Sequence, residues 1–319
     1  MTHPARTLRR DLCLPLPDQP VKASNYVGAF INLDRSPQRR AEMEGQFTAL
    51  GIADRYMRFP AVDGSRLNYN GPLQPGEAGS FLSHLRAMEQ LRPSGKCIHI
   101  LEDDALLSRP MGPMIEFAIA QGILDYFDIL YTDVYVAFEY LSSIRFHKQQ
   151  YDDFLTKSQV DFQKSFKVLT LEGQTFYGLS SYVVSAKAID RVVAYFRQEA
   201  ARGPTMANDI FVNRLVLERK LRAGYLFPFL TALRLERALQ MTVSGRSTDR
   251  YTMVTLGSNL IRYSFYVEND LPGYAAPLLD RAIGQSAMRP RDAHQKFINR
   301  AMEYVAMIEE PKQGQGKGS

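Results

Sequence analysis

Three consecutive acids, Glu102, Asp103 and Asp104, follow the apolar run 97–101 in the segment CIHILEDDALLS. Adjacent carboxylates repel one another, so either a bound cation or a solvated turn must relieve their charge. Carboxylate oxygens are the ligands that Mg²⁺ and Mn²⁺ prefer, and these ions commonly bridge protein carboxylates to substrate phosphates. The acidic trio therefore indicates either a site for a metal ion and a nucleotide or an exposed turn.

Two more acids, Asp34 and Asp133, each lie at the end of a segment that we expect to be a strand. In an open α/β sheet, ligands bind beyond the carboxyl ends of the strands, where helices begin. Arg35 and Arg39 lie at the start of the helix expected after Asp34, where backbone N–H groups and guanidinium groups can receive a phosphate. This grouping favours a nucleotide site, although the arginines can equally form an exposed helix face.

Other polar residues fall at positions that can border a cleft. His84 lies on the same helical stripe as Glu77 and Ser80, so all three can point to one side, although a histidine there is more often partly buried against a neighbour. Asp63 and Gly64 form a turn pair by default. These residues are therefore candidates that depend on their structural context.

Alternating strand and helix signals position these residues. Apolar strand patterns end at Asp34, at Asp63 and in the acidic trio, and a helix with Pro37 in its first turn and Gly51 after its end follows the first of them. A second helix is expected over residues 78–91. The alternation predicts an α/β fold with a Rossmann-like, mostly parallel sheet flanked by helices.

The chain divides into three parts by pattern. We expect an irregular leader over residues 1–24, a main domain over 25–250 and a helical C-terminal extension with a flexible tail over 251–319. A polar, aromatic-rich insertion at about 137–174 interrupts the main domain.

Composition excludes several classes of protein. The 319 residues are 45% hydrophobic, enough for a sizeable core, but no run of about 18 apolar residues suggests a membrane span and the N-terminus lacks the apolar core of a secretory signal. We therefore expect a cytoplasmic protein. The two cysteines, Cys13 and Cys97, indicate neither a disulfide framework nor a cysteine zinc site. The net charge of +5 is modest and the arginines are scattered, which argues against nucleic-acid binding.

Three common motifs for nucleotide binding and nucleophilic catalysis are absent from the sequence. The sequence contains no Walker-type loop, no glycine fingerprint for a dinucleotide and no Gly-x-Ser-x-Gly nucleophile elbow. A phosphate would have to be bound in another way.

Six segments taken in order resemble glycosyltransferase family 25, which holds lipooligosaccharide and collagen galactosyltransferases. They are INLDRSPQRRAEMEGQF, RFPAVDG, PGEAGSFLSHLRAMEQL, ILEDDALL, DILYTD and YGLSSYVVSAKAID, and the resemblance runs from about residue 26 to 250. It implies a GT-A-like sheet, a UDP-sugar donor (UDP-galactose first), Mn²⁺ or Mg²⁺, and transfer with inversion to a hydroxyl of a glycan or glycoconjugate such as lipooligosaccharide.

The resemblance also implies roles for individual residues. Asp104 would bind the metal, Glu102 would orient the donor and share the metal, and Asp103 could serve either role. The implied donor pocket comprises polar residues of the matching segments: Asn32, Asp34, Arg35, Arg39, Asp63, Gly64, Glu77, Ser83, His84 and Asp103.

Inversion requires a general base that deprotonates the acceptor hydroxyl. Asp209 matches an acid that the family places shortly after its YVVS-type strand, so it is the first candidate, and Asp133 and Glu77 are weaker ones. By default, Asp209 is simply an acid in the first turn of a helix.

Two other classes of function stay open at this point. The chain can be a non-catalytic relative that binds nucleotide sugars or serves as a scaffold, or a metal-dependent nucleotidyltransferase or phosphoesterase that uses the same acids. Release of pyrophosphate or inorganic phosphate instead of UDP would identify the latter. If the acceptor is a lipid-linked oligosaccharide, we expect peripheral contact with the inner face of the membrane through basic side chains. The sequence predicts no oligomeric state.

Overall fold

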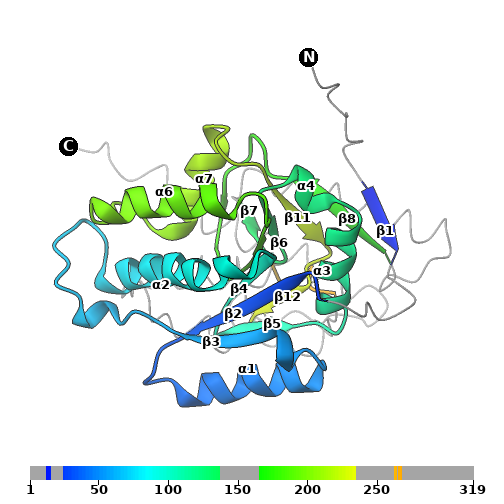
Figure 1. Cartoon of the computed structure of the whole chain (residues 1–319), viewed down its shortest axis with the longest axis horizontal. Helices are drawn as coiled ribbons and strands as arrows, with labels where there is room; N and C mark the ends of the chain where they lie inside the picture. The colour runs from blue at the N-terminus through cyan, green and yellow to red at the C-terminus, as the bar shows by residue number, and fades with distance from the viewer. Residues whose placement is uncertain (1–11, 16–23, 137–164, 235–261, 264, 268–319) are drawn as a thin grey trace, which may run out of the picture.

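The computed structural model describes residues 12–15, 24–136, 165–234, 262–263 and 265–267. Within these residues the centre of the molecule is an eight-stranded sheet with the order β1-β8-β11-β6-β10-β4-β2-β3 (Figure 1). In chain order its strands are β1 (Leu12–Pro15), β2 (Tyr26–Asn32), β3 (Tyr56–Pro60), β4 (Cys97–Glu102), β6 (Ile129–Tyr131), β8 (Ser165–Thr170), β10 (Ser181–Val184) and β11 (Ala223–Phe227).

The sheet is mixed in direction. The strand β2 pairs in parallel with β3 and β4, and β11 pairs in parallel with β6. The strand β10 lies antiparallel between β4 and β6, and β8 runs antiparallel to β11 and β1. The α/β class with a helix-flanked sheet is therefore confirmed, and the parallel part β3-β2-β4 brings three carboxyl ends to one edge.

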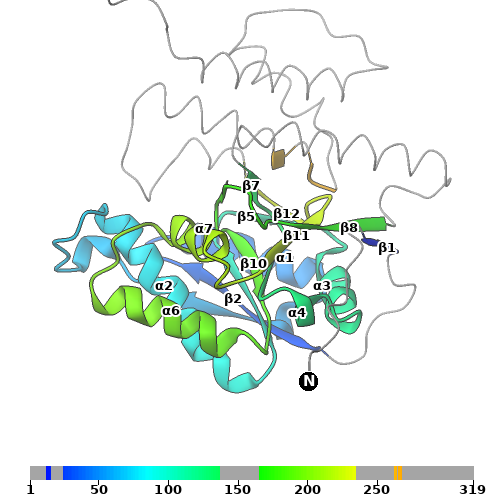
Figure 2. The same ribbon diagram turned by 90° about the horizontal axis from the view of Figure 1, so that it is seen from above.

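Helices cover both faces of the sheet, as the view from above shows (Figure 2). One face packs on α1 (Pro37–Ala49), α3 (Met111–Ala120) and α4 (Ile123–Tyr126), and the other packs on α2 (Pro75–Leu91), α6 (Ile189–Ala201) and α7 (Asn208–Leu217). The side chains of β4 alternate between the two cores, with Ile98 and Ile100 on one side and Cys97 and Leu101 on the other. Burial on both faces explains why β4 reads as a continuous apolar run.

The two helices that border the predicted site begin as their sequences dictate. The helix α1 starts at Pro37, with Ser36 at the N-cap position, and Gly51 beyond its end has a positive φ of 65°. The helix α2 begins at Pro75, three residues before the predicted start, because Gln74 and Glu77 form a reciprocal capping box.

Shorter elements complete the described chain. Two small two-stranded ribbons pair β12 (Thr231–Leu233) with β5 (Ala105–Leu107) and β7 (Tyr135–Val136) with β9 (Phe176–Tyr177). Three 3₁₀ turns are η1 (Ala53–Arg55), η2 (Gly64–Arg66) and η3 (Arg92–Ser94). We find no helix in the described ranges with the length and apolar character to cross a membrane.

Three segments differ from the outline that the sequence suggests. The predicted leader contains β1, and the end of the predicted insertion forms β8, while residues 137–164 lie outside the described ones. Three hydrophobic residues from the predicted C-terminal extension, Phe265, Tyr266 and Val267, are buried. Phe265 and Val267 exchange backbone hydrogen bonds with Phe229, and the rest of the predicted helical extension lies outside the described residues.

Candidate active site

A cleft opens at the edge where the parallel strands β2, β3 and β4 end. Its walls come from the end of β2 and the first turn of α1, from the loop after β3, from the first half of α2 and from the acidic trio after β4. The lining residues are Ile31, Leu33, Arg35, Ser36, Arg39, Ala61, Val62, Asp63, Gly64, Ser65, Pro75, Gly76, Ser80, Ser83, Glu102, Asp103 and Asp104.

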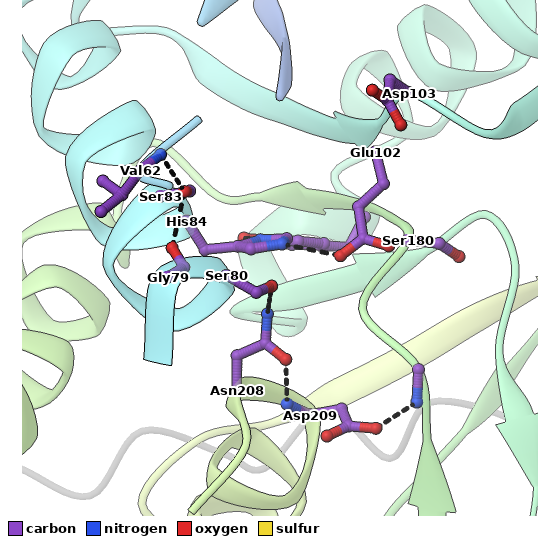
Figure 3. A network of polar contacts seen from close by, with 12 residues as sticks. Val62, Gly79, Ser80, Ser83, His84, Glu102, Asp103, Ser180, Asn208 and Asp209 are labelled. Atoms are coloured by element: carbon purple, nitrogen blue, oxygen red, sulfur yellow. Dashed lines mark hydrogen bonds and ion pairs between the residues drawn. The ribbon is translucent and has the colours of Figure 1, made fainter. Parts of the chain in front are cut away.

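The three consecutive acids take different directions. The Asp103 carboxylate accepts a hydrogen bond from Asn32 Nδ2 at 2.6 Å and pairs with Arg39 Nη1 at 2.9 Å. Glu102 turns to the opposite side, toward the helix α2 (Figure 3). Their mutual repulsion is thus reduced by divergence and by separate partners.

The third acid, Asp104, is left without such a partner. Its Oδ1 atom is buried and has no hydrogen-bond partner among the described residues. Burial, followed by the charges of Glu102 and Asp103, raises the pKa of this carboxyl to about 7. A buried carboxylate in this state gains from a bound cation, because the cation replaces the missing hydrogen bond and offsets the two neighbouring charges.

The described residues contain no group of three or more His, Cys, Asp or Glu side chains arranged to hold a metal ion. This fits the divergence of the trio, because Asp103 is already paired with Arg39. Mg²⁺ is commonly held by one or two carboxylates together with water and substrate phosphates, so Asp104 with Glu102 beside it is a donor set that fits such an ion.

The Glu102 side chain is hydrogen-bonded to a buried histidine. His84 Nε2 lies 3.2 Å from Glu102 Oε1, and His84 Nδ1 lies 2.9 Å from the Tyr182 hydroxyl. Because a carboxylate only accepts, the Nε2–H donates to Glu102, and the Tyr182 hydroxyl holds the other ring nitrogen. Burial alone would raise the pKa of Glu102, but the hydrogen bond from His84, the electrostatic attraction of the same histidine and the charges of Arg262 and Arg39 outweigh it and lower the pKa. Glu102 is therefore a fixed, ionised carboxylate at the cleft.

Asn32 and Asp34 lie behind or outside the cleft. The Asn32 side chain is buried and joins the carbonyl of Ser36 to Asp103, so it supports both the start of α1 and the acidic trio. The Asp34 side chain is 82% exposed and pairs with Arg58, which also donates to the Asn32 side chain and carbonyl. Arg58 is a residue of the site's support that sequence reasoning missed.

The loop after β3 forms the opposite wall. Asp63 accepts from the backbone and hydroxyl of Ser65 and forms an ion pair with Arg35 across the cleft mouth. Ser83 accepts from the backbone N–H of Val62 at 2.8 Å, which ties the loop to α2. Glu77, a predicted donor contact, accepts instead from the backbone of Gln74 and caps its own helix.

Two glycines let α2 approach this loop. A Cβ on Gly64 would lie 1.7 Å from the carbonyl oxygen of Pro75, and one on Gly79 would lie 2.6 Å from the carbonyl oxygen of Val62. Both obstacles are backbone atoms, so neither can move aside as a side chain would. The cleft wall is therefore built by direct backbone contact between the loop and the helix.

We expect Gly79→Ala to displace this loop, to destabilise the protein by about 1–3 kcal/mol and to weaken ligand binding in the cleft. Gly45→Ala is the matched control, because Gly45 also lies within a helix but its added Cβ would meet nothing within 4 Å. That control should stabilise the protein by about 0.5–1 kcal/mol through helix propensity. Thermal unfolding of both variants checks the pair, and equal shifts would contradict the close contact.

Asp209 lies at the start of α7, outside the residues that line the cleft. Its Oδ2 accepts from the backbone N–H of Gly178 at 2.9 Å and its Oδ1 from that of Ile210 at 2.8 Å. The preceding residue, Asn208, donates to Ser80 on the cleft wall (Figure 3). The carboxylate of Asp209 is thus oriented by two backbone groups, and Asp209 follows in sequence the residue that contacts the cleft wall.

Asp133, a weaker base candidate, is not placed to accept a proton from an acceptor. Its side chain is 1% exposed, and Arg262 contacts both carboxylate oxygens. Ser180 donates to the same carboxylate. The pairing corrects the expectation that Asp133 could serve as a base, because its oxygens already hold buried charge-assisted hydrogen bonds.

The structure brings eight of the fourteen predicted residues together at the cleft. The predicted residues that line the cleft are Arg35, Arg39, Asp63, Gly64, Ser83, Glu102, Asp103 and Asp104, and those that do not are Asn32, Asp34, Glu77, His84, Asp133 and Asp209. Sequence reasoning missed Arg58 and Arg262. Arg58 lies within the predicted strand that closes at Asp63 and is the first residue of the matching segment RFPAVDG, so it could have been found there, whereas nothing around Arg262 signals its position.

Comparisons with known proteins point to one family. Residues 24–212 match the model of the family described as Glycosyltransferase family 25 (LPS biosynthesis protein). The chain is similar to a Glycosyltransferase 25 family member of Drosophila pseudoobscura pseudoobscura, 37% identical over 95 residues, and to one of Aedes aegypti, 31% identical over 123 residues. These matches cover 24% and 32% of this chain and only 15% and 20% of the relatives' own length.

Proposed function

The chain belongs to glycosyltransferase family 25. We propose that it transfers a hexose from a UDP-sugar to a hydroxyl group of a glycan acceptor, and that galactose is the first choice for this hexose. The configuration at the anomeric carbon is inverted in this reaction. The bond from the anomeric carbon to UDP breaks, the bond to the acceptor oxygen forms, and the hydroxyl proton passes to a base.

The observation that carries the proposal is the state of Asp104. Its buried oxygen has no partner among the described residues, and it stands in an acidic trio that opens on the cleft. A carboxyl whose pKa is about 7 is a poor structural element but a suitable ligand for a divalent cation. We propose that Asp104, with Glu102 beside it, holds Mn²⁺ or Mg²⁺. Such an ion neutralises the negative charge that develops on the departing UDP.

The cations at the cleft suit a diphosphate. Arg39 lines it from the first turn of α1 and Arg35 from the residue before the N-cap, where backbone N–H groups and the helix dipole also favour an anion. Arg39 is held by Asp103, and Arg35 is held by Asp63 at the mouth. These residues bind and orient the diphosphate in the proposed complex.

We assign separate roles to two carboxylates, Asp209 and Glu102. We propose Asp209 as the general base, since its two backbone hydrogen bonds fix its orientation beside the cleft wall. Glu102 orients the donor, supported from behind by His84. A base at Asp209 leaves Glu102 free to contact the sugar.

The acceptor is proposed from the family description alone. The family is described by its part in lipopolysaccharide biosynthesis, so we propose a lipid-linked oligosaccharide or lipooligosaccharide acceptor. Such an acceptor would be met at the cytoplasmic face of a membrane, where the net charge of +5 favours contact with anionic lipids.

Calorimetric titration of UDP, UDP-galactose and UDP-glucose, each with and without Mn²⁺, tests the proposal. We expect manganese-dependent binding and the release of UDP when the acceptor is added. Absence of binding to the folded protein would overturn the donor site and favour a scaffold role. Release of pyrophosphate or inorganic phosphate would overturn sugar transfer in favour of a nucleotidyltransferase or phosphoesterase.

A further inference from the structure

Asp133 and Arg262 form a buried ion pair next to the site. Their side chains are 1% and 8% exposed, and the guanidinium contacts both oxygens of the carboxylate. Ser180 joins the pair, because its hydroxyl donates to Asp133 and accepts from Arg262 Nη2 at 3.0 Å. A planar guanidinium fork on a carboxylate fixes orientation as well as distance.

The pair contacts the short segment 178–180, which has no regular secondary structure. On one side, the Ser180 carbonyl accepts from the backbone N–H of Glu102 at 2.8 Å. On the other side, the backbone N–H of Gly178 donates to Asp209 at 2.9 Å. The segment thus holds both the donor-orienting acid and the proposed base.

Arg262 lies against both ends of this segment. Besides its bond to Ser180, its guanidinium lies 3.7 Å from the position that a Cβ on Gly178 would occupy. Gly178 has a φ of 80°, so its backbone turns in a way that a side chain would strain. Residues 178–180 belong to no strand, so strand pairing does not fix this turn. The contacts of Arg262 and Asp133 fix it instead.

We propose that Arg262 is a positioning residue of the active site, which with Asp133 fixes segment 178–180 and thereby the relative placement of Glu102 and Asp209. The inference rests on the proposed function. It also assigns a role in the reaction to a residue beyond the range 24–212 that the family model matches. Two main-chain hydrogen bonds anchor the residues around Arg262 to the core, one from the N–H of Phe229 to the carbonyl of Phe265 and one from the N–H of Val267 to the carbonyl of Phe229.

The test uses three variants. Two are the single substitutions Arg262→Lys and Arg262→Gln, and the third is a neutral double variant that carries both Asp133→Asn and Arg262→Gln. The double variant removes both buried charges, so it avoids the unpaired carboxylate that Arg262→Gln alone leaves behind. Three quantities are measured: the unfolding temperature, kcat and KM for UDP-galactose with Mn²⁺ and a lipooligosaccharide acceptor, and amide exchange over residues 176–182.

We expect the folded double variant to lose at least about tenfold in kcat with little change in KM, because misplaced reacting groups slow the chemical step. Amide exchange in the segment should become faster, and Arg262→Lys, which keeps the charge but not the fork, should recover part of kcat. A double variant with native kcat and native exchange would overturn the inference.

Arg55→Gln is the matched control. Arg55 pairs at 3.1 Å with Glu116, which is also 1% exposed, at the amino end of β2 and away from the cleft. It should lower the unfolding temperature without changing kcat of the folded enzyme. If the native chain transfers no sugar, the proposed function fails, and unchanged amide exchange in segment 178–180 of the double variant would then separately overturn the positioning role.

Discussion

Replacing Asp104 with asparagine should abolish metal-dependent UDP binding and lower sugar transfer by about 10³-fold, because the ion supplies several kcal/mol of stabilisation to the departing UDP. The same substitution should stabilise the metal-free protein at alkaline pH. The unpartnered oxygen of Asp104 and its two acidic neighbours make the ionised carboxylate unfavourable when no cation is bound. An uncharged amide removes that cost.

The direction of the pH dependence follows from the pKa of Asp104. Folding raises it from an ordinary 3.8 to about 7, so the folded state holds this proton more tightly than the unfolded chain does. The stability that Asp104 contributes is therefore lost as pH rises from about 4 to about 7, and the loss stays constant above that. Since the residue as a whole is only partly buried, we expect Asp104→Asn to recover about 1–4 kcal/mol at pH 8.

Thermal unfolding of the metal-free native protein and the variant, at about pH 5 and about pH 8, measures this difference. The gain in unfolding temperature should be larger at the higher pH. Added Mn²⁺ should stabilise the native protein and leave the variant unchanged. Asp54→Asn is the control, because Asp54 is an exposed acid on the 3₁₀ turn η1, and it should change neither property. A variant that is less stable than the native protein at both pH values would contradict an unsatisfied carboxylate at position 104.

The sequence predicts which residues meet, through the rule for parallel strands. The acidic trio, Arg39 and Asp63 follow or border the ends of β4, β2 and β3, and these strands pair in parallel, so their ends share one edge. The start of α1 is likewise predicted by Pro37 and its end by Gly51. Local patterns and one topological rule were sufficient for these residues.

The sequence does not predict which way each side chain turns. Glu102 and Asp103 are adjacent, yet one contacts His84 and the other Asn32, because each side chain follows the partner that the neighbouring element presents. The antiparallel placement of β10 has no local signal either, since an apolar strand buried on both faces reads the same in either direction. Arg262 pairs with a residue 129 positions away, a separation that no periodicity encodes.

Asp209→Asn should lower kcat by about 10²–10⁴-fold while the affinity for UDP with Mn²⁺ stays native, because a general base acts in the chemical step and not in donor binding. Asp209 does not line the cleft that we assign to the donor. Gly178 and Ile210 donate to different carboxylate oxygens, so the single amide oxygen of the variant can keep only one of these two bonds. The unfolding temperature of the variant is therefore compared with that of the native protein before its kcat is interpreted.

The variant Glu102→Gln distinguishes the role of Glu102 from that of Asp209. Glu102 lines the cleft and accepts from His84, so its loss should weaken binding of UDP-galactose as well as kcat. Asp190→Asn is the control for a helix first-turn acid, since Asp190 occupies the first turn of α6, where its exposed side chain pairs with Arg92. Steady-state rates and calorimetry on the three variants decide the assignment. Native kcat in Asp209→Asn with a large loss in Glu102→Gln would transfer the role of base to Glu102, because its hydrogen bond from His84 already holds it ionised and oriented at the cleft.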